Sequence, residues 1–318
     1  MMAPVDGDTG AAVTAAVNAP VNAPAHPWDA AAQGWDRHSP MLGAWLRDVT
    51  QSLLEATAIG PGARVLDIAA GAGDQTLDIA RRIGPTGYLL ATDISPRILA
   101  LAREKLQSAG LDSVATQVAD AEALGLAGAG FDAAVCRLGL MFCRKPLDAL
   151  TGAWSALRPG GHFGAVVFSA PAGNPCIAIM VSTAMRHAGL APASPFAPGS
   201  LLSLGQPGLM AELLRAAGFT GVEVRAVAAP MQLPSRQHYI DFVRSAGLPI
   251  TALLAPLSAA AQRDAWQDIA DQLDQFNTPS GWRGPNELLL CTAQRPARPA
   301  ATDVQHQATD KSPTGDRS

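Results

Sequence analysis

Cysteine is scarce in this chain of 318 residues, and its spacing speaks against a common class of metal site. No two cysteines form a Cys-x-x-Cys pair, and none lies beside a histidine cluster; the four are Cys136, Cys143, Cys176 and Cys291. Structural zinc sites need close ligand spacing because several ligands must converge on one ion. We therefore expect no metal, and reduced thiols in a cytoplasmic protein.

Charge and long apolar runs are also scarce. Charged residues make up 16% of the chain, the net charge is −4, and no basic stripe is visible. Nucleic acid is therefore not expected as a partner, because its phosphates are held by clustered lysine and arginine. No apolar run approaches the ~20 residues needed to span a bilayer. The N-terminus, with Asp6 and Asp8, lacks the basic start of a secretory signal.

Signature motifs of several enzyme classes are missing as well. There is no Gly-x-Ser-x-Gly elbow, which disfavours an α/β-hydrolase, and no Walker A loop for nucleotide triphosphates. What the chain does have is 48% hydrophobic residues, enough to bury a large core. We expect a small-molecule enzyme, and a homodimer is compatible with this interpretation.

Composition divides the chain into three parts. Residues 1–26 are rich in Ala, Pro, Val and Asn, and residues 296–318 are rich in Pro, Asp, Thr and Gln with almost no large apolar side chain. Such segments cannot bury enough apolar surface to offset the entropy of ordering them, so we predict a disordered leader and a disordered tail. Residues 27–295 are predicted to form the folded domain.

Apolar segments of strand length alternate with helical segments through most of this domain. Strands are predicted at 63–68, 88–93, 114–118, 131–138, 162–169, 222–228 and 287–293. This alternation is typical of an α/β fold in which helical crossovers join parallel strands. Three helical segments, 27–58, 172–205 and 235–280, are predicted to form a cap at the C-terminal strand edge, where ligands of such sheets bind.

Residues 65–74, Val-Leu-Asp-Ile-Ala-Ala-Gly-Ala-Gly-Asp, are the most informative segment. The small residues around Gly71 and Gly73 let backbone N–H groups approach a ligand at a helix N-terminus. Asp67, inside the strand, would repel a pyrophosphate and suits a ligand with a cationic end. S-adenosylmethionine (SAM) carries both a sulfonium and an ammonium group. The alternative, a dinucleotide fold, lacks its third glycine because Thr76 stands there.

Two further acids end the second and third predicted strands. Asp93 can accept hydrogen bonds from both hydroxyls of a ribose, which fits NAD as well as SAM. Asp120 can accept from an adenine amino group, while the N–H of Ala121 can donate to a ring nitrogen. Each acid alone could be an ordinary turn residue. Together with Asp67 they indicate an adenosine ligand across three successive strand ends.

These motifs resemble those of class I SAM-dependent methyltransferases, and in particular the group related to the ubiquinone/menaquinone C-methyltransferases. The narrower resemblance is carried by residues 136–142 (Cys-Arg-Leu-Gly-Leu-Met-Phe), 157–161 (Leu-Arg-Pro-Gly-Gly) and 216–219 (Ala-Ala-Gly-Phe). It implies a Rossmann-like seven-stranded sheet, mostly parallel with the last strand antiparallel. It also implies SAM-binding roles for Asp67, Gly71, Gly73, Asp93 and Asp120.

One position departs from the family pattern. Ala69 stands where the first motif often has glycine, which is tolerable provided that the backbone does not need a positive φ there. Two polar residues are left with open roles: Gln75 caps the helix or reaches the cofactor, and Arg137 contacts the cofactor carboxylate, contacts the substrate or snorkels at a strand end. The predicted cofactor site comprises Asp67, Ala69, Gly71, Gly73, Gln75, Asp93, Ile94, Asp120, Ala121 and Arg137.

Methyl transfer from a sulfonium needs alignment and exclusion of water, and a base only where the acceptor must lose a proton. His38 and His238 lie in the predicted cap and are the candidate bases, although either could be an ordinary histidine. Trp28 and Trp35 line the pocket or anchor the core. The acceptor is expected to be hydrophobic or aromatic: a quinol, a phenol or a secondary metabolite. The alternatives are an NAD-dependent oxidoreductase and a non-catalytic SAM-fold binding protein.

Overall fold

The computed structural model describes residues 26–111 and 114–297, so the predicted leader and tail lie almost wholly outside the described residues. Its centre is a seven-stranded sheet in the order β3-β2-β1-β4-β5-β10-β6. The strands are β1 (Arg64–Ile68), β2 (Tyr88–Asp93), β3 (Ala115–Val118), β4 (Phe131–Arg137), β5 (Leu157–Phe168), β6 (Thr220–Ala228) and β10 (Glu287–Gln294). The first five run parallel, while β10 runs antiparallel to both β5 and β6. The fold expected from the sequence is confirmed.

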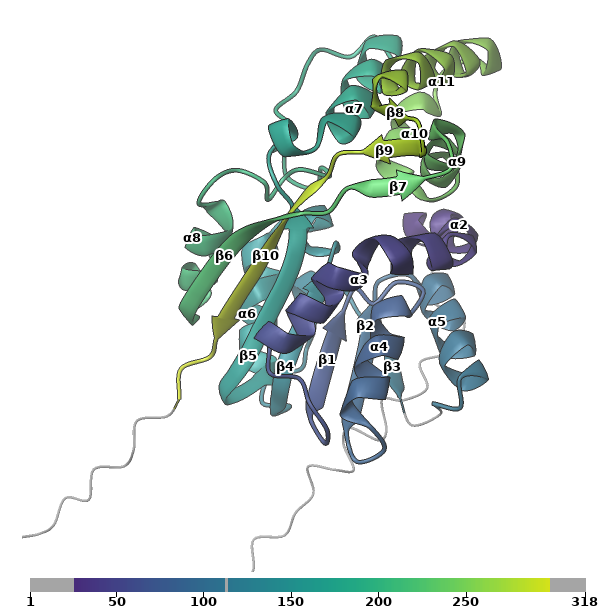
Figure 1. Cartoon of the computed structure of the whole chain (residues 1–318). Helices are drawn as coiled ribbons and strands as arrows, with labels where there is room; N and C mark the ends of the chain where they lie inside the picture. Colours follow the sequence, from purple (N-terminus) through teal and green to yellow (C-terminus); the bar gives the residue numbers. More distant parts are fainter. Residues whose placement is uncertain (1–25, 112–113, 298–318) are drawn as a thin grey trace, which may run out of the picture.

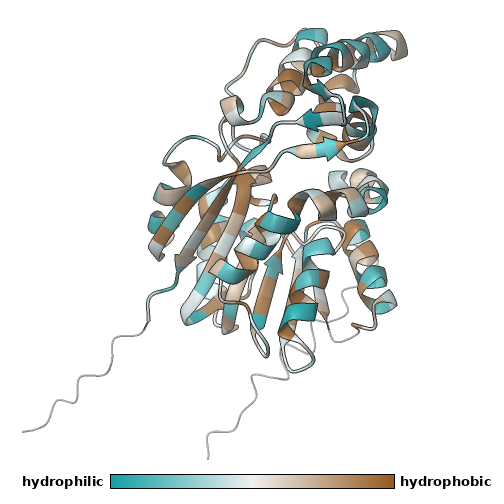
Figure 2. Ribbon diagram, viewed as in Figure 1, coloured by the Kyte–Doolittle hydropathy of each residue, from teal (hydrophilic) through white to brown (hydrophobic). Residues whose placement is uncertain are grey.

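Helices cover both faces of this sheet (Figure 1). They are α3 (Ser39–Ala56), α4 (Asp74–Ile83), α5 (Pro96–Ser108), α6 (Pro146–Ala156) and α8 (Leu209–Ala216). Buried side chains of the central strands, such as Val65, Leu66 and Val135, are completely enclosed. Figure 2 shows the same division, with apolar central strands and polar outer helix faces. This core holds the strand ends in place.

Helix α5 begins at a serine cap that is followed by proline. The Ser95 hydroxyl accepts a hydrogen bond from the N–H of Ile98, and Pro96 occupies the first helical position. A serine cap supplies a partner for a helix-end N–H, and proline there has no N–H to leave unpaired. Predicted and observed bounds agree for β2 and differ by one residue for β1, β3, β4 and β10.

The cap lies above the C-terminal ends of the parallel strands (Figure 1). It comprises η4 (Pro171–Gly173), α7 (Pro175–His187), α9 (Arg236–Ala246), α10 (Leu248–Leu254), α11 (Ala259–Leu273) and η5 (Asp274–Phe276). Helix α2 (Ala32–Arg37), preceded by η1 (Pro27–Ala31), packs against α9. The N-terminal helices and the later insertions therefore meet over the sheet edge.

Two details of the cap differ from the sequence prediction. Residues 190–205 form turns rather than helix, because Pro192, Pro195 and Pro198 interrupt the segment. A three-stranded antiparallel sheet, β7 (Met231–Leu233), β8 (Asn277–Thr278) and β9 (Gly281–Gly284), adjoins the helices. Strands this short carry too little alternation to be recognised in a sequence. Trp282 of β9 is completely buried and anchors this sheet.

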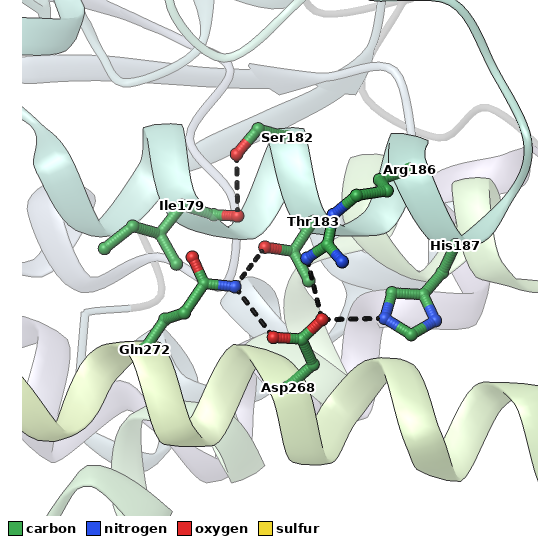
Figure 3. A network of polar contacts seen from close by, with 7 residues as sticks. All are labelled: Ile179, Ser182, Thr183, Arg186, His187, Asp268 and Gln272. Atoms are coloured by element: carbon green, nitrogen blue, oxygen red, sulfur yellow. Dashed lines mark hydrogen bonds and ion pairs between the residues drawn. The ribbon is translucent and has the colours of Figure 1, made fainter.

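A polar network joins α7 to α11 (Figure 3). Asp268 accepts hydrogen bonds from Arg186 (2.7 Å), His187 (2.9 Å) and Gln272 (2.9 Å). The Gln272 amide also donates to Thr183, at 2.9 Å. The hydrogen bond from His187, followed by those from Gln272 and Arg186, lowers the pKa of Asp268 to about 2. The network is a structural link within the cap.

Candidate active site

Two cavities adjoin each other between the strand ends and the cap. The larger, of about 400 Å³, lies over the loops that follow β1, β2, β3 and β4. The smaller, of about 80 Å³, lies beneath the cap helices. Trp28, Trp35, Leu138 and Phe142 line both cavities, so the boundary between them is apolar. We call the larger the cofactor cavity and the smaller the chamber.

The glycine-rich loop after β1 forms one wall of the cofactor cavity. Gly71 and Gly73 have φ values of 58° and 85°, in the left-handed region that glycine adopts without strain. A Cβ atom at Gly71 would meet nothing within 4 Å, so this backbone faces open space. At Gly73 a Cβ atom would lie 2.9 Å from the Cβ of Ala102 on α5. Gly71 thus allows close approach of a ligand, and Gly73 allows close packing of α4 on α5.

Alanine in place of glycine at position 69 would be harmless only if the backbone there needed no positive φ. The structure shows that this condition is not met. The φ of Ala69 is 54°, so the backbone does need the left-handed conformation. The Ala69 side chain packs toward Gly139, where an added Cβ would lie only 2.4 Å from the Cβ of Ala69. The loop therefore holds a non-glycine residue in a strained conformation, which typically costs about 1 kcal/mol or more.

Asp67 lies beneath the loop and does not line either cavity. Its carboxylate accepts hydrogen bonds of 2.7 Å from the amide of Gln75 and from the hydroxyl of Thr76. Complete burial raises the pKa of Asp67 to about 6, against the lowering effect of these two donors. The Gln75 oxygen, in turn, has no hydrogen-bond partner among the residues that the structure describes. Asp67 and Gln75 thus support the loop from below, while Gln75 also retains an unused acceptor.

Asp93 lines the cofactor cavity beside Ile94 and is 8% exposed. One carboxylate oxygen accepts from the N–H of Gly71 (3.0 Å), and the other accepts from the N–H of Ser95 (2.9 Å). Burial raises the pKa of Asp93, and the two backbone donors oppose that effect. Each carboxylate oxygen can accept a second hydrogen bond, so the group retains capacity for two hydroxyl donors.

Asp120 and Ala121 also line the cofactor cavity, at the end of β3. Asp120 caps η2 (Ala121–Ala123) by accepting from the N–H of Glu122 at 2.9 Å, and its side chain is exposed. Asp93 and Asp120 thus lie at neighbouring strand ends but differ in burial. A hydrogen bond made by the buried acid is screened less by water and contributes more to binding.

Arg137 also lines the cofactor cavity. Its guanidinium donates a hydrogen bond of 2.6 Å to the hydroxyl of Thr50 on α3. Burial lowers the pKa of Arg137, while the negative field of Asp67 raises it. The group remains a cation at neutral pH because an arginine side chain does not lose its proton in proteins. It places one fixed positive charge at the cavity wall.

The N-terminal segment contributes residues that the sequence analysis missed. His26, placed at the end of the predicted leader, lines the cofactor cavity. Asp29 in η1 is buried; it accepts from the N–H of His26 at 3.0 Å and from the hydroxyl of Ser95. The His-Pro-Trp-Asp run (residues 26–29) signals this helix start, because an acid three residues after a cap can bond back to it.

A second polar contact joins the N-terminal helices to the glycine-rich loop. Lys105 on α5 donates to Asp74, the first residue of α4, at 2.7 Å. Ser39, the first residue of α3, contacts both Lys105 and Asp74. The N-terminal segment is therefore tied to α5 and to the start of α4 at two points, and it forms a lid on the cofactor cavity.

The two histidines expected to act as bases line neither cavity. His38 lies between α2 and α3, where its ring contacts Phe242 and its Nε2 lies 3.1 Å from the Ser245 hydroxyl of α9. Burial and the nearby Arg37 lower the pKa of His38. His238 is exposed at the start of α9, within 2.9 Å of Ser235. Both histidines stabilise the cap or its helix start in the structure.

The chamber is almost entirely apolar. Besides the four shared residues it is lined by Trp45, Met141, Phe168, Ile177, Met180, Leu201, Met231, Tyr239, Phe242, Val243, Ala246, Gly247, Pro249, Ile250 and Asn286. Tyr239 is its single titratable group among the described residues, and burial raises its pKa well above 10. The chamber is therefore suited to an apolar molecule, chosen by its size and shape.

Metal ligands and membrane-spanning helices are both absent from residues 26–111 and 114–297. No three His, Cys, Asp or Glu side chains converge there as a metal site would require. No helix in these ranges combines the length and the apolar character needed to cross a bilayer.

Part of the domain is similar to known proteins. Residues 65–161 match the family model described as "Methyltransferase domain". The chain is 37% identical over 131 residues to the ubiquinone/menaquinone biosynthesis C-methyltransferase UbiE of Ectopseudomonas mendocina. That match covers 41% of this chain and 51% of the relative, so the chain spans about half the length of the curated relative it matches.

Solved structures share the fold. The YcgJ protein of Bacillus subtilis superposes with a TM-score of 0.54 at 18% identity, covering 79% of this chain and all of that one. Phosphoethanolamine N-methyltransferase 2 of Haemonchus contortus, solved with S-adenosyl-L-methionine, gives 0.52 at 15% identity over 86% of this chain and 60% of that one. The resemblance drawn from the motifs is confirmed: residues 65–161 match a methyltransferase domain model, and the chain is similar in sequence to a ubiquinone/menaquinone C-methyltransferase.

Proposed function

We propose that this protein is a SAM-dependent methyltransferase whose acceptor is a small hydrophobic or aromatic molecule such as a quinol, a phenol or another secondary metabolite. The observation that carries the proposal is the pair of adjoining cavities. One is lined by charged strand-end residues, the other by apolar residues, and the two share the wall formed by Trp28, Trp35, Leu138 and Phe142.

The residues of the cofactor cavity fit SAM chemically. Asp93 has acceptor capacity for two ribose hydroxyls, and the backbone at Gly71 faces open space. Asp120 and Ala121 offer an acceptor and a backbone N–H for an adenine edge. Arg137 offers a cation for a carboxylate. A volume of about 400 Å³ is within the range of small-molecule sites in proteins.

Bound SAM supplies an electrophilic methyl group on a sulfonium, whose departure leaves a neutral thioether. The chain then has to hold the acceptor atom in line with the methyl–sulfur bond and keep water out. The aromatic faces of Trp28, Trp35 and Phe142 at the shared wall favour a nearby cation, and their apolar surface excludes water. The lid formed by η1, α2 and α3 contributes the two tryptophans, so lid closure completes the site.

Among the described residues, no carboxylate, histidine, lysine or arginine lines the chamber. An acceptor buried there would meet no side chain able to remove a proton at neutral pH, since the pKa of Tyr239 is raised well above 10. This supports an acceptor that is already nucleophilic, such as an electron-rich ring carbon, and that passes its proton to solvent after transfer. His38 and His238 line neither cavity, so either could act as a base only if the cap were arranged differently and brought it to the acceptor.

Calorimetric titration with SAM, S-adenosylhomocysteine and NAD in parallel tests the cofactor. We expect micromolar binding of the first two and none of NAD. Binding of NAD alone would favour the oxidoreductase alternative. Screening quinols and phenols for transfer of a labelled methyl group then tests the acceptor class. SAM binding without transfer to any apolar acceptor would favour the non-catalytic alternative.

A further inference from the structure

Strand β6 is an open edge of the central sheet. It ends the strand order and pairs on one side with β10; among the described residues, no strand pairs with its other side. Seven of its nine residues are exposed. In Figure 1 it lies at the margin of the sheet, far from β3 at the opposite edge. The outer backbone groups of β6 are thus available to another strand.

Open edges of this length are usually protected, because their unpaired N–H and C=O groups invite pairing with other chains. Common protective devices are proline, lysine, a bulge within the edge strand or a covering segment. Strand β6 contains neither proline nor lysine. Its pairing with β10 has one irregularity, between Thr220 and Glu223 at the start of the strand, and is regular from Glu223 to Ala228. Its central residue, Val224, is also one of three large hydrophobic side chains that are exposed in the described part of the chain. The opposite edge, β3, has only four residues, all at least partly buried.

The sequence of β6 is self-complementary about Val224. Glu223 precedes this residue and Arg225 follows it, and neither forms an ion pair or a side-chain hydrogen bond within the described residues. In an antiparallel pair centred on Val224, Glu223 lies directly opposite Arg225 of the second copy, and Arg225 lies opposite its Glu223. Residues opposite each other project to the same face of a sheet, so both charge pairs can form. Val224 meets itself on the other face.

We propose that β6 is a homodimer interface, in which two copies pair their β6 strands antiparallel about Val224 and form one continuous sheet. The arrangement obeys two-fold symmetry, as a closed dimer requires. No residue of β6 lines either cavity, so both sites of the dimer remain accessible to ligands. The proposal does not depend on the methyltransferase activity.

Charge exchange tests both the interface and its register. Glu223→Arg and Arg225→Glu each place like charges opposite each other twice in the dimer. The double variant Glu223→Arg/Arg225→Glu restores both opposite-charge pairs. Sedimentation velocity over a range of concentrations is expected to show a dimer for the wild type, a dimer constant weakened at least about tenfold for each single variant, and recovery in the double variant.

A matched control is Glu104→Arg, which inverts an exposed acid on α5. It should leave the dimer constant unchanged. Circular dichroism and thermal unfolding of each variant separate loss of pairing from loss of fold. A wild type that is monomeric at all concentrations would overturn the proposal. So would a dimer that the single variants leave intact, or a double variant that is no better paired than the single ones.

Discussion

The two cavities differ in what builds them. The cofactor cavity is lined by loops that follow consecutive strands and carries six charged side chains, Asp74, Asp93, Asp120, Glu122, Arg137 and Arg144, together with His26. The chamber gathers residues from the lid, the sheet and three cap helices, and none of those described is an acid or a base at neutral pH. Charged groups at fixed strand ends specify which ligand binds, whereas apolar walls specify mainly its size and shape. Four experiments test this contrast.

Removal of the buried acid should have the largest effect. Asp93→Ala deletes an acceptor for two hydroxyls and is expected to weaken SAM binding by roughly 100-fold or more, since hydrogen bonds to charged groups contribute about 1.5–3 kcal/mol each. Asp120→Ala removes an exposed acceptor and should cost about tenfold at most. Calorimetry measures both. Equal losses of SAM affinity in the two variants would contradict the role of burial. Thermal unfolding of Asp93→Ala shows whether loss of the hydrogen bonds from Gly71 and Ser95 also destabilises the fold.

The raised pKa of Asp67 predicts a pH dependence. The pKa of Asp67 is about 6 in the folded state and 3.8 for the unperturbed group, so protonation of Asp67 favours the folded state. This stabilisation is complete below pH 3.8 and is lost as the pH rises through 6. A shift of this size corresponds to roughly 3 kcal/mol.

Denaturant unfolding of wild type and Asp67→Asn at pH 4 to 8 measures this effect as a difference. Relative to the variant, the wild type without ligand should become less stable across that range. Its affinity for SAM should rise over the same range, because the ionised carboxylate, although it lies beneath the loop, attracts the cationic end of the ligand at a distance. A pH-independent difference between the two proteins would show that Asp67 does not titrate there.

Truncation of a chamber side chain should affect the acceptor and spare the cofactor. Phe242 lines the chamber but not the cofactor cavity, and its ring contacts Trp35 and His38. Phe242→Ala is expected to raise KM for the acceptor about tenfold, on the order of one lost apolar contact, with little change in SAM affinity. Phe276→Ala is the matched control, because this half-buried cap aromatic packs on Trp282 and lines neither cavity. A similar KM increase in the control would indicate a general loosening of the cap.

Relief of strain in the loop should have the smallest effect. Ala69→Gly allows the same φ of 54° without strain and is expected to stabilise the protein by about 0.5–1 kcal/mol. Ala58→Gly is its control, since Ala58 has a φ of 53° and lines neither cavity. Thermal unfolding should show similar gains for both, while only Ala69→Gly should alter SAM affinity. Destabilisation by Ala69→Gly would mean that packing against Gly139 outweighs the strain.

Sequence reasoning succeeded wherever the determinants are close together in the chain. The loop glycines and the acids that end β2 and β3 act through neighbouring residues and through the rule that parallel strands end at one edge. It placed Ala69 at the position where glycine is usual but could not tell that φ is positive there. It also left His26 in the leader, because His26 is held by Asp29, which contacts Ser95 some 70 residues away.

Local patterns in the amino-acid sequence predict the class of fold, the strands of the central sheet and the charged residues at their ends, because periodicity and turn chemistry are local. The tertiary structure alone decided which of those residues reach a cavity. It put Asp93 in the cavity wall and Asp67 beneath the loop, moved His38 and His238 away from both cavities, and assembled the chamber from side chains more than 200 residues apart. Packing between distant segments sets these positions, and no local pattern records it.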